Sequence, residues 1–252
     1  MKKNFLFGFL LAAATMMFVA CSTDDDSDVT TDDDSDVTTD DTVTDDGTTD
    51  DGGTTTTFLI DIDGDFSDWD EVSADALATA SIDGYTSDYP DLLEMKFCAD
   101  ETFIYTYFKI ETANSNNELL IFINSTGDAA DGYSSWMWDG SLYADYMIVS
   151  TASGNYADDA ALYAFDTADT SLTNWSWIET VAAGNGLYSI SDVVTAGTII
   201  EFEGRIIRDF MTGLGDEIEV GVAIDNAEWA TIGVLPALST DAAQAPLTVK
   251  LP

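Results

Sequence analysis

The chain has 252 residues, of which 48 are acidic and seven are basic, and its formal net charge is −41. So acidic a chain repels phosphate groups, which argues against nucleic acid and anionic lipid headgroups as partners. There is no histidine, so Ser-His-Asp and Cys-His catalysis are excluded in their usual forms, and Cys98 alone cannot build an ordinary zinc site.

Residues 1–20 have the three-part layout of a secretory signal peptide: two lysines, an apolar run over 5–19, and a small residue before Cys21. The run is shorter than the roughly 20 apolar residues of a membrane span. The stretch FVAC at 18–21 resembles the lipobox of bacterial lipoproteins, although Phe18 stands where Leu is usual. The resemblance implies lipidation of Cys21 and an anchor in the outer membrane. A soluble secreted protein with an incidental cysteine is the alternative.

Residues 22–57 contain 14 aspartates and no basic residue, and the segment TDDDSDVT at 23–30 recurs at 31–38. Such a segment has almost nothing to bury and repels itself, so we expect residues 21–57 to form a disordered acidic linker behind the lipidated cysteine. The acids directly after Cys21 also resemble the export signals of lipoproteins displayed on the surface of some Gram-negative bacteria. This predicts a surface-exposed protein, with a plain solvated spacer as the alternative.

The segment DIDGDFSDWDE at 61–71 crowds acidic residues around one glycine and one tryptophan. An EF-hand loop starting at Asp61 would need glycine where Phe66 stands and glutamate where Val72 stands, so the template fails. The segment instead predicts a strand over 58–62 that ends in a turn at Asp63-Gly64, after which Phe66 and Trp69 close the end of a core.

From residue 58 onward, apolar residues alternate with polar ones in short runs separated by turn residues. One short helical turn is expected within 208–215, and Cys98 is expected to be a small buried residue. About 195 residues of this kind predict an all-β domain over 58–252, folded as a single jelly-roll-like β-sandwich. The runs that we expect to be strands are 92–99, 102–111, 118–124, 145–151, 160–167, 173–181, 186–190, 198–207, 217–224 and 247–251.

Four segments in order, the IDG…DW opening and the stretches 92–110, 119–150 and 199–236, resemble family 9 carbohydrate-binding modules and the related DOMON-type β-sandwiches. The resemblance covers most of 58–252. It implies a sandwich fold in a group whose members bind sugars or other ligands and often hold a structural calcium.

The loop over 124–139 is the candidate calcium site that the resemblance suggests, with Asn124 standing where relatives commonly have aspartate. Asp128, Asp131 and Asp145 would supply carboxylate oxygens and Asn124 an amide oxygen, which suits the irregular oxygen coordination of calcium. Alternatively, these are solvated loop carboxylates.

Tryptophans occur as two doublets, Trp136/Trp138 and Trp175/Trp177, and on a strand each doublet would share one face. Each doublet is either an exposed platform for the apolar face of a sugar or a part of the core. Trp136 and Trp138 follow a polar loop, which favours exposure for them. The alternation of Trp175 and Trp177 with polar residues is also what a core pair would give, which favours the core for that doublet, and Trp229 is expected in the core as well.

The stretch EFEGR places Glu201, Glu203 and Arg205 on one face of a strand. Carboxylates on neighbouring same-face positions lie about 7 Å apart, within the range of glycosidase pairs, but acids on a solvent-facing strand are common in so acidic a chain. We interpret the three residues as sugar contacts or a surface ion pair.

Three functions are compatible with these features. The first is a lipid-anchored, non-catalytic protein of the cell surface that binds a glycan. The second is a structural or accessory lipoprotein that engages other outer-membrane proteins. The third is a carboxylate-dependent glycosidase, which the lack of an isolated acid pair in an apolar setting disfavours.

Overall fold

The computed structural model describes residues 59–111, 117–127, 131–138, 141–151, 159–238 and 245–252. The chain divides into two units, Met1–Gly53 and Thr54–Pro252, and all described residues belong to the second. They form antiparallel strands and three short 3-10 helices, which confirms the all-β class. No helix in these described ranges is long and apolar enough to cross a bilayer.

The first sheet has the order β1-β2-β3-β12-β10 in the described part of the chain, with β11 also paired to β12. Its long strands fall where the alternating runs predict them, while β1 and β11 are not among the predicted strands. The strands are β1 (Ala78–Ser81), β2 (Leu92–Ala99), β3 (Phe103–Ile110), β10 (Tyr188–Ile190), β11 (Val194–Ala196) and β12 (Ile199–Ile207).

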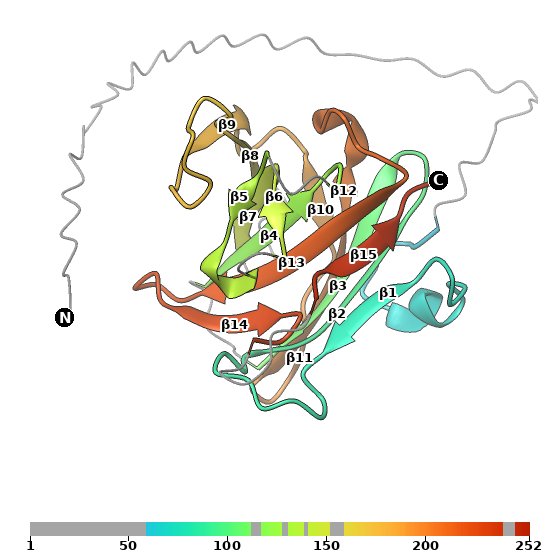
Figure 1. Ribbon diagram of the computed structural model, residues 1–252. Coiled ribbons are helices and arrows are strands. Elements are labelled where there is room, and N and C mark those ends of the chain that lie inside the picture. The colour runs from blue at the N-terminus through green and yellow to red at the C-terminus, as the bar shows by residue number, and fades with distance from the viewer. Residues whose placement is uncertain (1–58, 112–116, 128–130, 139–140, 152–158, 239–244) are drawn as a thin grey trace, which may run out of the picture. The chain divides into compact units, whose positions relative to one another are not determined.

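The second sheet has the order β14-β13-β4-β7-β8-β9 among the described residues, with β15 also paired to β13. Figure 1 shows β13, drawn in orange, running between β4 and the strands β14 and β15. The strands are β4 (Glu118–Asn124), β7 (Tyr146–Thr151), β8 (Ala161–Phe165), β9 (Trp177–Val181), β13 (Glu217–Asp225), β14 (Thr231–Leu235) and β15 (Leu247–Lys250).

The main hydrophobic core lies between the two sheets, because alternate residues of each strand point inward. On β4, Ile121 and Ile123 are fully buried in this core, where they belong to the same cluster as Phe108 of β3 and Phe202 of β12. The predicted β-sandwich is therefore confirmed.

The outer face of the first sheet is partly covered by residues 59–72, which we call the N-terminal clasp. Ile60 and Trp69 are buried against Cys98 and Tyr107, in a cluster separate from the main core. The predicted burial of Trp69 and of Cys98 is confirmed. Trp69, with the partly buried Phe66 beside it, covers the outer face of the sheet and does not close the end of the main core as predicted. The strand expected over 58–62 is wrong for its described part, since 59–62 has no strand and the regular element is the 3-10 helix η1 (Phe66–Asp70).

The outer face of the second sheet is covered by what we call the aromatic layer. It consists of the hairpin β5 (Tyr133–Ser134) and β6 (Tyr143–Ala144), with the 3-10 helix η2 (Trp136–Trp138) between them. A third 3-10 helix, η3 (Arg208–Phe210), follows β12 and lies inside the predicted helical turn. Both sheets therefore carry a cover on the side away from the main core.

Candidate functional site

Trp138 is the central wedge of the aromatic layer. Its indole is fully buried, and a Cβ placed on Gly221 of β13 would lie 2.7 Å from its ring, so only glycine leaves room for it. The indole Nε1 donates to the backbone oxygen of Pro236 at 3.3 Å. The whole side chain of Trp138 therefore contacts other parts of the protein, and none of it is open to a ligand.

The expectation that Trp136 and Trp138 are both exposed is wrong for Trp138. The two residues lie on a 3-10 helix, where residues two apart point in different directions because a turn takes three residues. Trp136 is 53% exposed while Trp138 is 0% exposed. The sequence spacing predicts one shared face only if the segment is a strand.

Trp136 and Trp175 are both exposed, and each lies near the buried Tyr133. The ring of Tyr133 meets that of Trp175 edge to face at a centroid distance of 5.4 Å, and Trp136 meets Tyr89 in the same manner at 5.5 Å. A hollow of about 230 Å³ is lined by Tyr133, Ser134, Trp136 and Thr173, and Trp175 is not part of its lining. The lining combines two aromatic rings with three hydroxyl-bearing residues and has no charged residue.

The assignment of Trp175 and Trp177 to the core is wrong for Trp175, which is 58% exposed. Strand β9 begins at Trp177, so Trp175 lies before the strand. The alternation of inward and outward side chains along a strand therefore does not apply to Trp175. Trp177 is partly buried against the aromatic layer, and its ring lies 5.4 Å from that of Tyr133. The Nε1 atom of Trp177 is buried and has no hydrogen-bond partner among the described residues.

Trp229 is also misassigned to the core, since it is 69% exposed. It lies at the tip of the β13–β14 hairpin with a φ of 58°, a left-handed conformation that is unfavourable for a bulky residue. The side-chain oxygen of Asn226 accepts hydrogen bonds from the backbone N–H groups of Glu228 and Ala230, which hold this turn. Strain of this kind is frequent at ligand-contact positions.

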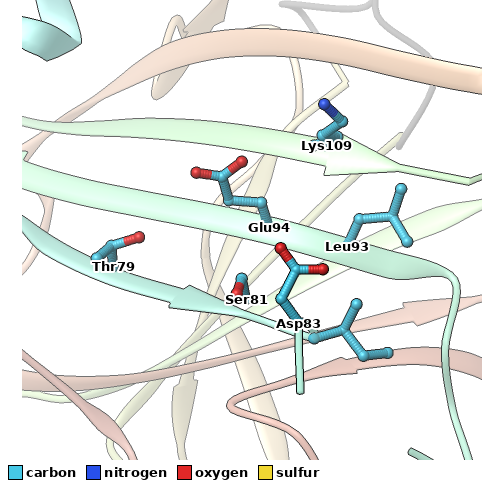
Figure 2. A pocket seen from close by; sticks show the side chains of 7 residues that line it. Thr79, Ser81, Asp83, Leu93, Glu94 and Lys109 are labelled. Carbon is cyan, nitrogen blue, oxygen red and sulfur yellow. The ribbon is translucent and has the colours of Figure 1, made fainter. Parts of the chain in front are cut away.

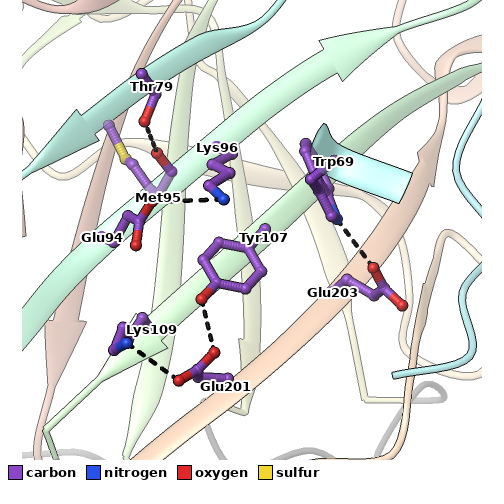
Figure 3. A network of polar contacts seen from close by, with 9 residues as sticks. All are labelled: Trp69, Thr79, Glu94, Met95, Lys96, Tyr107, Lys109, Glu201 and Glu203. Atoms are coloured by element: carbon purple, nitrogen blue, oxygen red, sulfur yellow. Dashed lines mark hydrogen bonds and ion pairs between the residues drawn. The ribbon is translucent and has the colours of Figure 1, made fainter. Parts of the chain in front are cut away.

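Glu203 is not a solvent-facing ligand contact as expected, because it is 0% exposed beneath the N-terminal clasp. Its carboxylate accepts hydrogen bonds from Trp69 Nε1 at 2.9 Å and from the backbone N–H groups of Asp63 and Gly64 at 3.1 and 2.8 Å. Burial raises the pKa of Glu203, although these donors act in the opposite direction. Figure 3 shows the indole of Trp69 pointing at this carboxylate.

Glu201 and Arg205 lie on the same face of β12 as Glu203 but are only half-buried. Glu201 accepts a hydrogen bond from the hydroxyl of Tyr107 at 2.8 Å and pairs with Lys109 at 3.1 Å (Figure 3). The hydrogen bond to Glu201 and burial raise the pKa of Tyr107, burial being the larger cause. The guanidinium of Arg205 lies over the ring of Phe103 at 4.9 Å. The structure therefore separates these three residues from the aromatic layer, which covers the other sheet.

Three of the predicted calcium ligands, Asn124, Asp131 and Asp145, lie among the described residues. Asn124 is buried, and its side-chain oxygen accepts from the backbone N–H groups of Thr126 and Gly127. Asp145 accepts from the backbone N–H and the hydroxyl of Ser125, both at 2.7 Å. Asp131 and Asp145 line one hollow of about 260 Å³. Among the described residues, no three acidic, histidine or cysteine side chains gather closely enough to hold a metal ion.

Two of the predicted site residues, Asp128 and Cys21, lie outside the described residues. Sequence analysis also missed the exposure of Trp175 and Trp229. For Trp229, the run TIGVL at 231–235 is a strand signal that would have placed the tryptophan in a hairpin tip.

No protein-family model matches the sequence, and no curated protein matches it either. One solved structure with similarity is a family 9 carbohydrate-binding module from Caldicellulosiruptor kristjanssonii in complex with cellotriose, at a TM-score of 0.38 and 14% identity, covering 76% of this chain and 89% of that one. Another is a family 9 module from the same organism in complex with glucose, at a TM-score of 0.34 and 15% identity, covering 75% and 81%.

Proposed function

We propose that the domain binds a glycan, without catalysis, at the aromatic surface formed by Trp136, Tyr133 and Trp175. The observation that carries the proposal is the exposure of two large indoles near one hollow. Trp136 lines the hollow together with Ser134 and Thr173, and Trp175 contacts the ring of Tyr133, which also lines it. A sugar ring has an apolar C–H face that packs on an aromatic ring, and hydroxyls at its edge that hydrogen-bond to polar neighbours.

A glycan array followed by calorimetry on the purified protein tests this proposal. Replacement Trp175→Ala should weaken binding of the selected glycan by about tenfold or more, because one aromatic contact contributes on the order of 1 kcal/mol or above. Trp136→Ala should act in the same direction. Val194→Ala is the control, since Val194 is also an exposed apolar residue but lies on β11 at the other sheet. A folded protein that binds no glycan on the array contradicts the proposal.

A carboxylate-dependent glycosidase based on Glu201 and Glu203 receives less support. Glu203 is sealed beneath the clasp and is engaged by three donors, so the two carboxylates do not face a common substrate space. Sugar cleavage that is lost in Glu201→Gln would argue for the enzyme.

The proposal also includes a lipid anchor on Cys21, the outer membrane and display on the cell surface, all of which are inferred from the sequence motifs of the first 57 residues. Three acyl groups hold a protein on a membrane where one does not suffice. Replacement Cys21→Ser should release the protein into the soluble fraction. External protease should degrade the wild-type protein on intact cells, and protection from protease would contradict surface display.

Calcium at the loop of Asn124, Asp128, Asp131 and Asp145 remains a proposal. The oxygens of Asn124 and Asp145 already accept backbone and hydroxyl donors, so a bound ion would share or displace them. A rise in melting temperature on adding calcium, reversed by EDTA and absent in Asp145→Asn, supports the site. No shift with a folded protein removes it.

An accessory role with a protein partner is the second candidate, because exposed tryptophans are also typical of protein interfaces. The exposure of Trp229 at the tip of the β13–β14 hairpin is the observation that favours it. Stoichiometric co-purification of one membrane protein that Trp229→Ala abolishes would support this role over glycan binding.

A further inference from the structure

A polar groove lies on the outer face of the first sheet, in the part that the N-terminal clasp leaves open. Its volume is about 350 Å³, within the range of small-molecule pockets. Figure 2 shows the carboxylates of Asp83 and Glu94 and the ammonium group of Lys109 around it. The groove belongs to β1, β2 and β3, whereas the aromatic layer covers the second sheet. The lining side chains that matter here are Thr79, Ser81, Asp83, Leu93, Glu94 and Lys109.

An irregularity in strand β2 shapes this groove. The pairing of β2 with β3 shifts register between Leu92 and Glu94, so that Leu92 faces Ile110 and Glu94 faces Lys109. As a result, the consecutive residues Leu93 and Glu94 both line the groove, which a regular strand would not allow. Bulges that redirect a side chain in this way are common next to binding sites.

The walls of the groove are held by hydrogen bonds before any ligand arrives. The hydroxyl of Thr79 donates to the backbone oxygen of Met95, and the backbone N–H of Ile82 donates to Leu93. At the end of β1, Gly84 has a φ of 83°, which the turn into β2 requires. Lys109 is fixed by its 3.1 Å ion pair with Glu201.

The charges around the groove select against an anionic ligand. Lys109 is paired with Glu201 at 3.1 Å, and Glu94 is itself paired with Lys96 at 3.6 Å. An ammonium group of a ligand would therefore bind at Asp83, which forms no ion pair among the described residues, and would take the place of Lys96 at Glu94. Two carboxylates, those of Asp83 and Glu94, line the groove against one ammonium group. The domain over 58–252 also has 34 acidic and five basic residues, so its field attracts cations.

The remaining lining residues offer hydroxyl groups and an apolar patch, which are the groups that bind a sugar ring. Thr79 and Ser81 are two apart on β1 and present hydroxyls on one face, about 7 Å from each other. Leu93 supplies an apolar patch next to the carboxylate of Glu94. Hydroxyls, an apolar patch and carboxylates together suit a ligand that carries hydroxyl groups, a C–H face and an ammonium group.

We propose that this groove is a second binding site, for amine-bearing saccharides, with Asp83 and Glu94 receiving the ammonium group and Thr79 and Ser81 the ring hydroxyls. The site is independent of the aromatic surface, and its ligand differs by the positive charge.

Calorimetry on the full protein at about 0.15 M salt tests the proposal, with a tetrasaccharide of β-1,4-linked glucosamine as the probe. The probe should bind, and its fully N-acetylated counterpart should bind at least about tenfold more weakly, because acetylation removes the charge that the carboxylates recognise. Asp83→Asn and Glu94→Gln should each weaken binding by about tenfold.

Two controls make the outcome decisive. The double variant Asp216→Asn/Glu217→Gln removes two exposed acids at the start of β13 and should leave the affinity unchanged. Spermidine, an amine without a sugar ring, should bind more weakly than the probe. No binding of the probe, equal binding of the acetylated sugar or of spermidine, or an equal loss in the Asp216/Glu217 variant would each overturn the proposal. Loss of glycan binding in Trp175→Ala, with the probe still bound, would leave both sites standing as separate.

Discussion

The two outer faces of the sandwich are covered by different means. On the first sheet, the clasp is fastened by a buried carboxylate, Glu203, which reaches residues about 140 positions earlier in the chain. On the second sheet, the aromatic layer is fastened by shape, since Trp138 fills the space over Gly221. One cover therefore depends on polar contacts and on protonation, and the other depends on packing volume. Mutations and changes in pH should therefore affect the stability of the two covers differently.

The largest effect is expected at Trp138. Trp138→Ala would leave a cavity over Gly221 and should lower the free energy of unfolding by about 4 kcal/mol. Chemical denaturation of the variant measures this loss. Trp136→Ala, two residues away on the exposed side, should change stability by no more than about 0.5 kcal/mol. Similar losses in both variants would contradict the buried position of Trp138.

Glu203→Ala should be next in size. It would leave the indole N–H of Trp69 and two backbone N–H groups without their acceptor, which should cost about 3 kcal/mol of stability. Hydrogen exchange should show that the amides of Asp63 and Gly64 lose protection before those of the aromatic layer.

The contribution of Glu203 to stability should change with pH in one direction. Because the pKa of Glu203 is raised in the folded state, its contribution to stability grows as the pH falls from neutrality toward the ordinary value of 4.5, and is lost as the pH rises through the folded-state pKa. Glu203→Gln should abolish this part of the pH dependence. A variant with an unchanged stability–pH curve would refute the assignment.

Trp229→Gly should raise stability by about 1 kcal/mol, because glycine adopts a φ of 58° without the steric cost that a bulky residue bears. Trp229→Ala retains the steric cost of a side chain at this φ, and it should leave the stability nearly unchanged because the indole is mostly exposed. Thermal unfolding of the two variants compares them directly. A destabilised glycine variant would show that the indole contributes to folding after all.

The smallest effect is expected where the second sheet carries two facing acids. Glu118 and Asp225 lie opposite each other on β4 and β13, and burial, with a smaller effect of Asp225, raises the pKa of Glu118. Glu118→Gln should therefore stabilise the protein at neutral pH, by less than about 1 kcal/mol because the group is partly solvated. The gain should vanish below the ordinary pKa of 4.5, where the wild-type acid is protonated as well. Glu228→Gln, at an exposed hairpin position, should show neither effect.

Alternation along the chain was enough to predict the long strands and the sandwich. Strands such as β2 and β12 bury apolar residues of one face in the main core and alternate them with polar residues, so their pattern is visible without the fold. Strand β4 is instead a continuous apolar run, because it is buried on both faces. The strands β1 and β14 are short and were missed, although β14 completes the hairpin that presents Trp229. The error on Trp229 follows from that omission.

The site was harder to predict because its residues owe their surroundings to distant parts of the chain. Glu203 is a polar residue in a polar pattern, and only the clasp, far away in sequence, turns it into a buried anchor. Trp136 and Trp138 look equivalent in the sequence, and the 3-10 geometry of η2 decides which one is buried. A local sequence pattern shows at which spacing apolar residues recur. It does not show which distant segment of the chain covers them in the folded protein.

The hydrogen bonds that hold the clasp have a consequence for any force applied from the N-terminal side of the domain. Any tension that arrives through the preceding chain reaches the fold at Leu59, whose backbone N–H contacts the hydroxyl of Tyr105, and then at the Asp63–Gly64 turn on Glu203. These bonds join the entry segment to β3 and β12 in the middle of the first sheet, away from the edge strand β1. Pulling would therefore load interior strands, and the aromatic layer on the opposite sheet would keep its geometry until the clasp peeled away.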